Sequence, residues 1–248
     1  MGKDRSGGRS EGGAERRLTG APREFQFHGR RFGHRLREGR RALIENRLPA
    51  LRVCDPAADA PVSDLGSLFA RPMQGYWLEI GFGAGEHLAA QALARPDIGF
   101  LGCEPFVNGV AALLAKMEAG NIANIRLFDE DARFLLPRLP EGVIDRAFIL
   151  FSDPWPKKRH NKRRIITPKT LDALARILRP GAELRFASDD MSYVSWTLEH
   201  MRRCPEFSWP AAGPADWRNR PADAVETRYE RKALEQGRRC VYLGFRRN

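Results

Sequence analysis

A glycine-rich loop between a short apolar segment and a helical pattern constrains the fold of this sequence more than any other feature. Gly81, Gly83 and Gly85 directly follow the apolar segment 76–80, and a helical pattern begins at residue 86. Glycine permits the tight turn that such a loop needs and lets the backbone approach a ligand closely. A strand, a glycine turn and a helix in this order are typical of a cofactor-binding unit in an α/β sheet.

The alternation of strands and helices continues along the chain. Residues 99–103, 125–128, 143–152, 183–187 and 240–245 are predicted to be further strands, and residues 86–95, 110–119, 168–178 and 193–201 helices, with a short basic helix at 35–46. Thr167 and Pro168 suit the N-cap and first turn of one helix. The pattern predicts an α/β protein with an open, mostly parallel sheet, helices on both faces, and ligands at the carboxyl ends of the strands.

The charge of the chain favours a polyanionic partner. The 248 residues carry a net charge of +11, and residues 1–41 hold twelve Lys or Arg against five Asp or Glu. Counterion release makes the binding of a basic surface to nucleic acid favourable. Residues 1–24 contain few large apolar side chains and are predicted to be disordered. We expect residues 1–40 to form a basic, disordered extension and residues 41–248 to form one domain.

Neither a metal nor a membrane is indicated. The four cysteines are far apart and predicted to be buried reduced thiols, and the histidines lack metal-ligand spacing. No apolar run approaches the roughly 18 residues of a membrane-spanning helix, and no signal peptide is visible. We expect a cytoplasmic protein without a bound metal; the sequence leaves open whether it is a monomer or a homodimer.

Three acidic residues near strand ends separate two classes of cofactor. Glu79 precedes the glycine loop, Glu104 ends the second predicted strand, and Asp131 follows the third. The nicotinamide fingerprint places its third glycine five residues after the first, whereas Gly85 lies four residues after Gly81. S-adenosylmethionine is a cation with a ribose diol and no pyrophosphate, so it suits these acids better. Glu104 is placed to accept the ribose hydroxyls, a contact made in both cofactor classes, and Asp131 to contact the adenine amine. The glycine spacing disfavours a nicotinamide dehydrogenase.

The loop after the fourth predicted strand has the residues of a base-binding site. It contains Asp153 and Trp155, each followed by a proline. In such a rigid loop Trp155 can stack on a flat base while Asp153 hydrogen-bonds to it. Six of the next eight residues, 157–164, are Lys or Arg and none is acidic. A basic run beside the catalytic loop indicates contacts with phosphate and favours an RNA substrate.

Together these motifs resemble the tRNA (guanine-N7-)-methyltransferase family. The similarity runs from about residue 76 to residue 247 and is carried by residues 78–83, 102–104, 131–132, 151–155, 159–165, 187–189 and 227–230. The segment 159–165 after Asp-Pro-Trp is the most specific. The resemblance implies a Rossmann-like class I methyltransferase. It also implies transfer of a methyl group from S-adenosylmethionine to N7 of guanine 46 in the variable loop of tRNA.

The resemblance further implies a role for individual residues. The cofactor would be bound by Glu79, Gly81, Gly83, Gly85, Glu104, Asp131 and Asp153, and Asp153 would also be catalytic. The target guanosine would be contacted by Lys157, Asp189, Thr227, Arg228, Tyr229 and Glu230. The RNA would be contacted by Arg159, His160, Asn161, Lys162, Arg163 and Arg164.

Two other functions stay open at this point. The Asp-Pro-Trp loop also resembles loops used for amino-group methylation, and a fold does not fix a substrate, so ribosomal RNA or a protein is an alternative substrate. A non-catalytic RNA-binding protein with the same fold is the second alternative. Acids at all three predicted cofactor positions argue against it.

Overall fold

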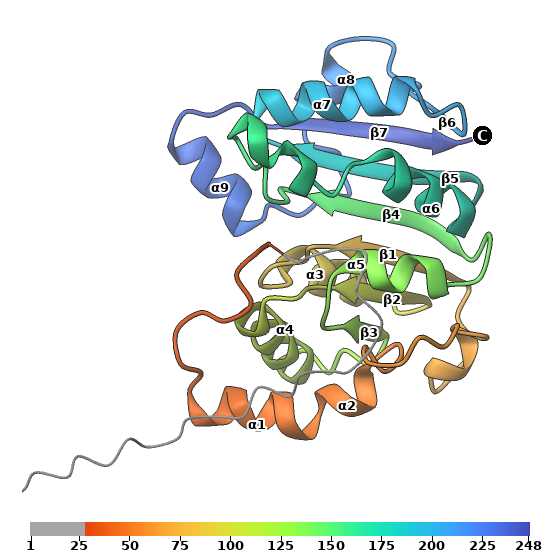
Figure 1. Cartoon of the computed structure of the whole chain (residues 1–248). Coiled ribbons are helices and arrows are strands. Elements are labelled where there is room, and N and C mark those ends of the chain that lie inside the picture. The colour runs from red at the N-terminus through yellow and green to blue at the C-terminus, as the bar shows by residue number, and fades with distance from the viewer. Residues whose placement is uncertain (1–27) are drawn as a thin grey trace, which may run out of the picture.

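The seven strands of the sheet follow the order β3-β2-β1-β4-β5-β7-β6. The structure is a computed structural model that describes residues 28–248. Its strands are β1 (Gly75–Ile80), β2 (Ile98–Cys103), β3 (Ile125–Phe128), β4 (Ile144–Leu150), β5 (Leu178–Ser188), β6 (Phe207–Ser208) and β7 (Val241–Arg247). The first five strands are parallel, and β7 is antiparallel to β5 and β6. The predicted open, mostly parallel sheet is confirmed (Figure 1).

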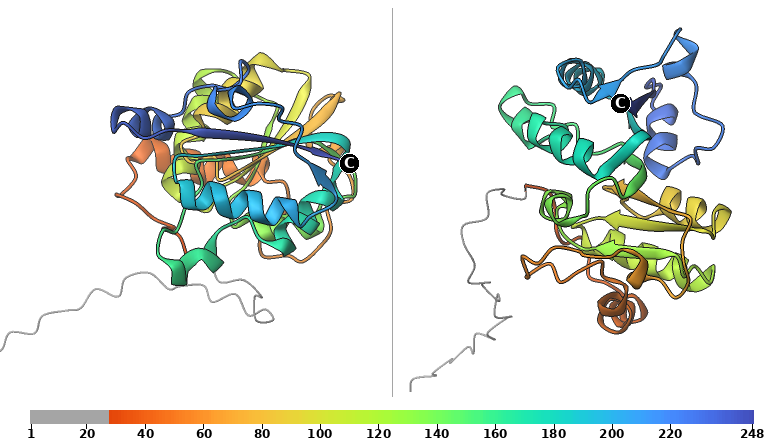
Figure 2. Two further views of the ribbon diagram at one scale, coloured as in Figure 1. Left: turned by 90° about the horizontal axis from the view of Figure 1, so that it is seen from above. Right: turned by 90° about the vertical axis from the view of Figure 1, so that its right-hand side faces the viewer.

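Helices cover both faces of this sheet (Figure 2). One face is covered by α1 (Glu38–Asn46), α2 (Leu48–Leu51), α3 (Glu86–Ala94) and α4 (Val107–Ala119). The other face is covered by α5 (Ala132–Leu135), α6 (Pro168–Ile177) and α7 (Met191–Arg202). The short helices α8 (Ala215–Arg218) and α9 (Arg228–Glu235) lie between β6 and β7 in the chain.

The central strands are apolar because both of their faces are buried. In β1, Leu78 and Ile80 pack with α5, α6 and α7, whereas Trp77 packs on the opposite face with α3 and α4. In β4, Ile149 and Phe148 divide between the two faces in the same way. Parallel strands buried on both sides are expected to be apolar, and β4 is apolar from Ala147 to Leu150, after Asp145 and Arg146 near its start.

Most predicted elements are found within a few residues of their predicted bounds. Thr167 caps α6 as expected, since its Oγ1 accepts a hydrogen bond of 3.3 Å from the amide of Thr170. The strand β5 begins at Leu178, earlier than predicted, and continues through Pro180 and Gly181. Helix α9 and strand β6 were not predicted, because α9 is mostly polar and β6 has only two residues.

The segment before α1 is packed against the domain. The carbonyl oxygen of Arg31 accepts a hydrogen bond of 2.9 Å from the amide of Val107, and the Arg31 guanidinium pairs with Glu130 at 2.7 Å. The amide of Gly33 donates to Asn108 Oδ1 at 2.8 Å. The prediction of a disordered extension therefore does not fit residues 28–40; residues 1–27 lie outside the described part of the chain.

All four cysteines are free thiols, and Cys103, Cys204 and Cys240 are buried as expected. Over residues 28–248, no helix combines the length and apolar character needed to cross a membrane. The same residues contain no group of three or more His, Cys, Asp or Glu arranged to hold a metal ion.

Candidate active site

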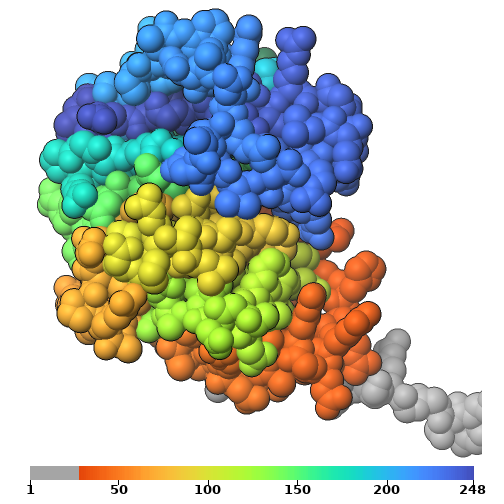
Figure 3. Space-filling model, turned by 180° about the vertical axis from the view of Figure 1, so that it is seen from behind, coloured from red at the N-terminus to blue at the C-terminus, as the bar shows by residue number. Residues whose placement is uncertain are grey.

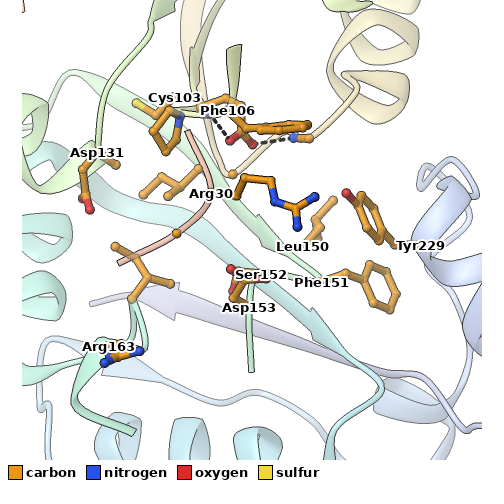
Figure 4. A pocket seen from close by; sticks show the side chains of 18 of the residues that line it. Arg30, Cys103, Phe106, Asp131, Leu150, Phe151, Ser152, Asp153, Arg163 and Tyr229 are labelled. Atoms are coloured by element: carbon orange, nitrogen blue, oxygen red, sulfur yellow. Dashed lines mark hydrogen bonds between the residues drawn. The ribbon is translucent and has the colours of Figure 1, made fainter. Parts of the chain in front are cut away.

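A cavity of about 380 Å³ lies where the carboxyl ends of β1, β2 and β4 meet (Figure 4). Ligand sites of roughly 300–1,000 Å³ at this edge of an open α/β sheet are common. Several predicted site residues line this cavity, namely Gly81, Gly83, Glu104, Asp131, Asp153, Arg163 and Tyr229. The structure therefore brings the glycine loop, Glu104, Asp131 and the Asp-Pro-Trp loop together, whereas the predicted cofactor residues Glu79 and Gly85 are not in the cavity lining.

The three glycines of the loop all have left-handed backbone conformations. Their φ angles are +77° at Gly81, +57° at Gly83 and +74° at Gly85. Gly83 also meets α4 closely, because a Cβ atom on Gly109 would lie 2.2 Å from the Gly83 carbonyl oxygen. This tight approach leaves the amides of the loop close to the end of β2.

Glu104 connects the glycine loop to the end of β2. Its carboxylate accepts hydrogen bonds from the amide of Gly83 at 2.8 Å and from the amide of Phe106 at 2.9 Å. The pKa of Glu104 is raised to about 7, mainly by burial and also by the charges of Asp153 and Glu79, while the two hydrogen bonds act in the opposite direction. A buried carboxylate at this place is stabilised by any ligand that offers it hydroxyl donors.

Glu79 lies behind the cavity and does not line it. Its Oε2 is 2.7 Å from Nδ1 of His87 on α3, and both side chains are buried. The His87 ring also contacts Phe148 edge-on, with 4.8 Å between the ring centroids. Sequence reasoning missed His87, since a single histidine in an apolar helix gives no signal until its partner on β1 is known.

Asp131 caps α5 at the rim of the cavity. Its Oδ1 accepts hydrogen bonds from the amide and Nε of Arg133, at 3.0 and 2.9 Å, and Oδ2 accepts from Nη2 of Arg133 at 2.5 Å. The guanidinium therefore fixes the orientation of the carboxylate.

The Asp-Pro-Trp loop has an unusual backbone that one buried arginine supports. Phe151 and Trp155 have φ angles of +50° and +45°, which are uncommon for residues other than glycine. Arg164 is 1% exposed, and its Nε donates to the Pro154 carbonyl oxygen at 2.8 Å while Nη2 donates to Ser192 Oγ at 2.9 Å. The predicted contact of Arg164 with RNA does not fit this position, because its donors face inward and hold the loop.

Of the remaining residues of the basic run, Arg163 lines the cavity, and the others adjoin the Asp-Pro-Trp loop in the chain. Residues Lys158–Arg163 form a short 3-10 helix, and Lys157, Lys158, Arg159 and Lys162 are exposed. The Arg163 guanidinium lies 5.0 Å from the centroid of the Trp155 ring, so this ring packs against a cation. Asp153 lines the cavity nearby, and burial raises the pKa of its carboxyl group.

The C-terminal segment reaches the cavity through Tyr229. Thr227 caps α9 by accepting a hydrogen bond of 3.1 Å from the amide of Glu230. Glu230 is 2% exposed, and its carboxylate is bound by the hydroxyl of Tyr242 and by Arg220 Nε at 3.5 Å. Tyr229 is 49% exposed and lines the cavity (Figure 4).

Other residues predicted to contact the substrate lie outside the cavity lining. These are Lys157, Asp189, Thr227, Arg228 and Glu230. Asp189 follows β5 and forms an ion pair with Arg238. In contrast, Arg30 lines the cavity and its side chain points into it (Figure 4). Sequence reasoning missed Arg30 because it placed this residue in a disordered extension.

Comparison with known proteins identifies the family. Residues 74–243 match a family described as putative methyltransferase. The tRNA (guanine-N(7)-)-methyltransferase of Rhodospirillum rubrum is 52% identical over 232 residues, which cover 90% of this chain and 88% of that protein. The protein of the same name from Nitrobacter hamburgensis is 50% identical over 233 residues, covering 92% and 91%. The chain belongs to the tRNA (guanine-N(7)-)-methyltransferase family. The family resemblance of the sequence is confirmed.

Solved structures of other methyltransferases share the fold of this family member. The 16S rRNA methyltransferase KamB aligns with a TM-score of 0.52 at 16% identity, over 71% of this chain and 89% of that chain. The 16S rRNA (adenine(1408)-N(1))-methyltransferase of Catenulisporales acidiphilia aligns with a TM-score of 0.50 at 16% identity, over 71% and 86%. The likeness confirms the class I methyltransferase fold. S-adenosylmethionine, predicted from the sequence, is the methyl donor of this tRNA (guanine-N(7)-)-methyltransferase family.

Proposed function

We propose that the protein transfers the methyl group of S-adenosylmethionine to N7 of guanine 46 in the variable loop of tRNA. One observation supports this most: Asp153 shares a cavity with Gly83 and Glu104 on one side and Tyr229 on the other, beside an exposed basic helix. A cofactor site, an acid and an aromatic ring thus lie next to a basic helix that could bind a polyanion such as RNA. A tRNA substrate also implies action in the cytoplasm.

The cavity has the donors and acceptors that the cofactor requires. Glu104 offers a buried carboxylate at the end of β2, where ribose hydroxyls can donate to it. Asp131 presents a carboxylate on the cavity wall for the adenine amine. Glu79 lies one layer deeper, hydrogen-bonded to His87, and would act on the cationic end of the cofactor from there. When bound, S-adenosylmethionine supplies an electrophilic methyl group.

The reaction needs positioning more than proton transfer. Guanine N7 has a free lone pair in the ring plane and loses no proton when it is methylated. The base gains positive charge in the transition state, so a nearby carboxylate is stabilising. Asp153 lines the cavity and is exposed there, so its carboxylate is accessible to a base bound in the cavity.

The guanine would be held from the opposite wall. Tyr229 is exposed in the cavity and offers its ring for stacking. Lys157, Arg159 and Lys162 are exposed and directly follow the Asp-Pro-Trp loop in the chain, so we assign them to the flanking phosphates of an extruded nucleotide. We also assign Asp189 and Glu230 to the guanine edge. This assignment requires Asp189 to exchange Arg238, and Glu230 to exchange Tyr242 and Arg220, for donors of the base.

The test uses labelled S-adenosylmethionine and two unmodified tRNA transcripts that differ only at position 46. The transcript with guanine there is expected to yield 7-methylguanosine, and the transcript with adenine there is expected to yield none. Label in another nucleoside, or equal label in both transcripts, would refute the position. Label in ribosomal RNA or protein but not in tRNA would favour the alternative substrate. Absence of transfer to any of these would favour the non-catalytic RNA-binding protein.

A further inference from the structure

The connection between β6 and α9 crosses the sheet on the face that carries α3. Arg146 of β4 and Arg185 of β5 project from this face, since Arg146 is paired in register with Trp77 and Arg185 with Phe148. Both contact Asp223, which belongs to the connection. Figure 3 shows the C-terminal segment in blue lying directly beside α3 in yellow on this side of the molecule.

Asp223 completes a closed group of two arginines and two acids. Arg146 donates to Asp223 at 2.8 Å and to Glu183 at 2.8 Å, while Arg185 donates to Asp223 at 2.8 Å and to Glu183 at 3.0 Å. Each guanidinium thus bridges both carboxylates. Asp223 is the one member of this group that does not come from the sheet, so it joins the connection to β4 and β5.

Asp223 also contacts α3, the helix that follows the glycine loop. The side chain of Gln91 on α3 donates to the Asp223 carbonyl oxygen at 2.5 Å. Helix α3 begins directly after Gly85 of the glycine loop. Asp223 therefore contacts α3, which follows the cofactor loop, β4, which leads into the Asp-Pro-Trp loop, and the neighbouring strand β5.

Four residues after Asp223, the chain enters the segment proposed to contact guanosine. Glu230 is tied to β7 through Tyr242, and Asp223 is tied to β4 and β5, so residues 224–229 are held at both ends. Between these points, Tyr229 lies against Gly83, since a Cβ atom on Gly83 would be 3.1 Å from its ring.

We propose that Asp223 is a positioning residue for methyl transfer. Its ion pairs with Arg146 and Arg185 hold the 224–230 segment so that Tyr229 stays over the glycine loop. This role rests on the proposed function, because only that function makes the position of Tyr229 important for catalysis. The contacts of Asp223 themselves do not depend on which substrate is bound. Arg185 is only 7% exposed, so loss of Asp223 would leave this largely buried guanidinium paired with Glu183 alone, which is destabilising.

The experiment compares Asp223→Ala and Asp223→Asn with a matched control, Asp145→Asn. Asp145 also pairs with an arginine, Arg179 at 2.6 Å, and lies at the amino-terminal end of β4, whereas the Asp-Pro-Trp loop follows the carboxyl end. For Asp223→Ala we expect kcat/KM for tRNA to fall at least about tenfold, while the Kd for S-adenosylhomocysteine by calorimetry stays within about twofold. Asp223→Asn keeps one acceptor for an arginine and is expected to recover part of the loss. The control is expected to lose stability without losing kcat/KM.

A second measurement needs no substrate. Trypsin cleavage after Arg218, Arg228 and Arg231 reports whether the connection opens, and we expect it to be faster in Asp223→Ala than in the wild type or in Asp145→Asn. Unchanged cleavage and unchanged kcat/KM in Asp223→Ala would overturn the proposal, as would an equal loss of S-adenosylhomocysteine affinity. A wild-type protein that does not methylate guanine refutes the proposed function instead, and the cleavage rates then still decide whether Asp223 holds the segment.

Discussion

The ring of Tyr229 lies against the backbone of Gly83, so close that a Cβ atom at residue 83 would sit 3.1 Å from Cε2 of the ring. Gly83 belongs to the loop that closes the cofactor side of the cavity, and its amide donates to Glu104. Tyr229 belongs to α9, about 150 residues later in the chain. The two halves of the site are therefore in van der Waals contact.

Gly83→Ala is expected to weaken the binding of S-adenosylhomocysteine about tenfold, because the new methyl group is strained at φ +57° and presses on Tyr229. Gly181→Ala is the matched control: its φ is +81°, but nothing lies within 4 Å of its Cβ position. Both variants are expected to unfold at lower temperature, and calorimetry is expected to show weaker binding for Gly83→Ala alone. Combining it with Tyr229→Ala is expected to restore part of the affinity. Equal affinities in Gly83→Ala and Gly181→Ala would contradict the importance of this contact.

The affinity for the cofactor is expected to depend on pH through Glu104. The pKa of this carboxyl group is raised to about 7 in the free protein. As the pH falls through 7 the group gains a proton and loses an acceptor for a ribose hydroxyl, so affinity is lost on the acid side and retained above it. The Kd of S-adenosylhomocysteine is expected to rise about tenfold from pH 8 to pH 6. Glu104→Gln is expected to bind weakly at both pH values; the same pH dependence in this variant would assign the titration to another group.

Asp153→Asn is expected to lower the single-turnover rate by about a hundredfold or more, because the neutral amide no longer stabilises the positive charge on the base. Binding of S-adenosylhomocysteine is expected to fall much less. Asp129→Asn is a suitable control, since Asp129 also follows a strand of the sheet but pairs with Arg52 at 2.7 Å and does not line the cavity. A comparable loss of turnover and cofactor affinity in Asp153→Asn would show that its role is in binding.

Arg164 and Lys162 are expected to act differently although both belong to the basic run. Arg164→Ala leaves the Pro154 carbonyl oxygen and Ser192 without this donor and is expected to lower the free energy of unfolding by roughly 2–3 kcal/mol. Lys162 is exposed, and Lys162→Ala is expected to leave stability unchanged while making the plot of log K for tRNA against log salt shallower by about 1. Urea denaturation and filter binding at several salt concentrations measure the two effects. If Arg164→Ala were as stable as the wild type and its tRNA affinity depended less on salt, the original prediction that Arg164 contacts RNA would be supported.

The sheet could be predicted from the sequence because its strands are apolar runs punctuated by Gly and Pro. The apolar run in β4 and the glycines after β1 placed the central strands and the cavity edge correctly. Antiparallel β7 was predicted as a strand, but its direction and its place between β5 and β6 depend on contacts far apart in sequence. Helix α9 escaped prediction because its turns carry charged residues, with Glu230 and Ala233 its buried positions.

The place of a residue in the candidate site was predictable where it follows a predicted strand, as for Glu104 and Asp153, which both line the cavity. It was not predictable where a residue acts through a partner. His87 contacts Glu79, and Asp223 contacts Arg146 and Arg185. The local sequence around either residue gives no signal of these partners. Arg164 shows the converse error, because a basic residue in a basic run was taken to face RNA and instead faces inward.

The position of β7 affects how the protein is made on the ribosome. Although β7 comes after every other strand in the chain, it pairs with β5 along six residues and carries Tyr242, which binds Glu230. Until residues 241–247 leave the ribosome, β5 has an unpaired edge open to association with other chains. A nascent chain that has formed β1 through β5 therefore has its cofactor loop but lacks the side of the cavity that Tyr229 lines. The addition of β7 covers the edge of β5 and completes the site at the same time.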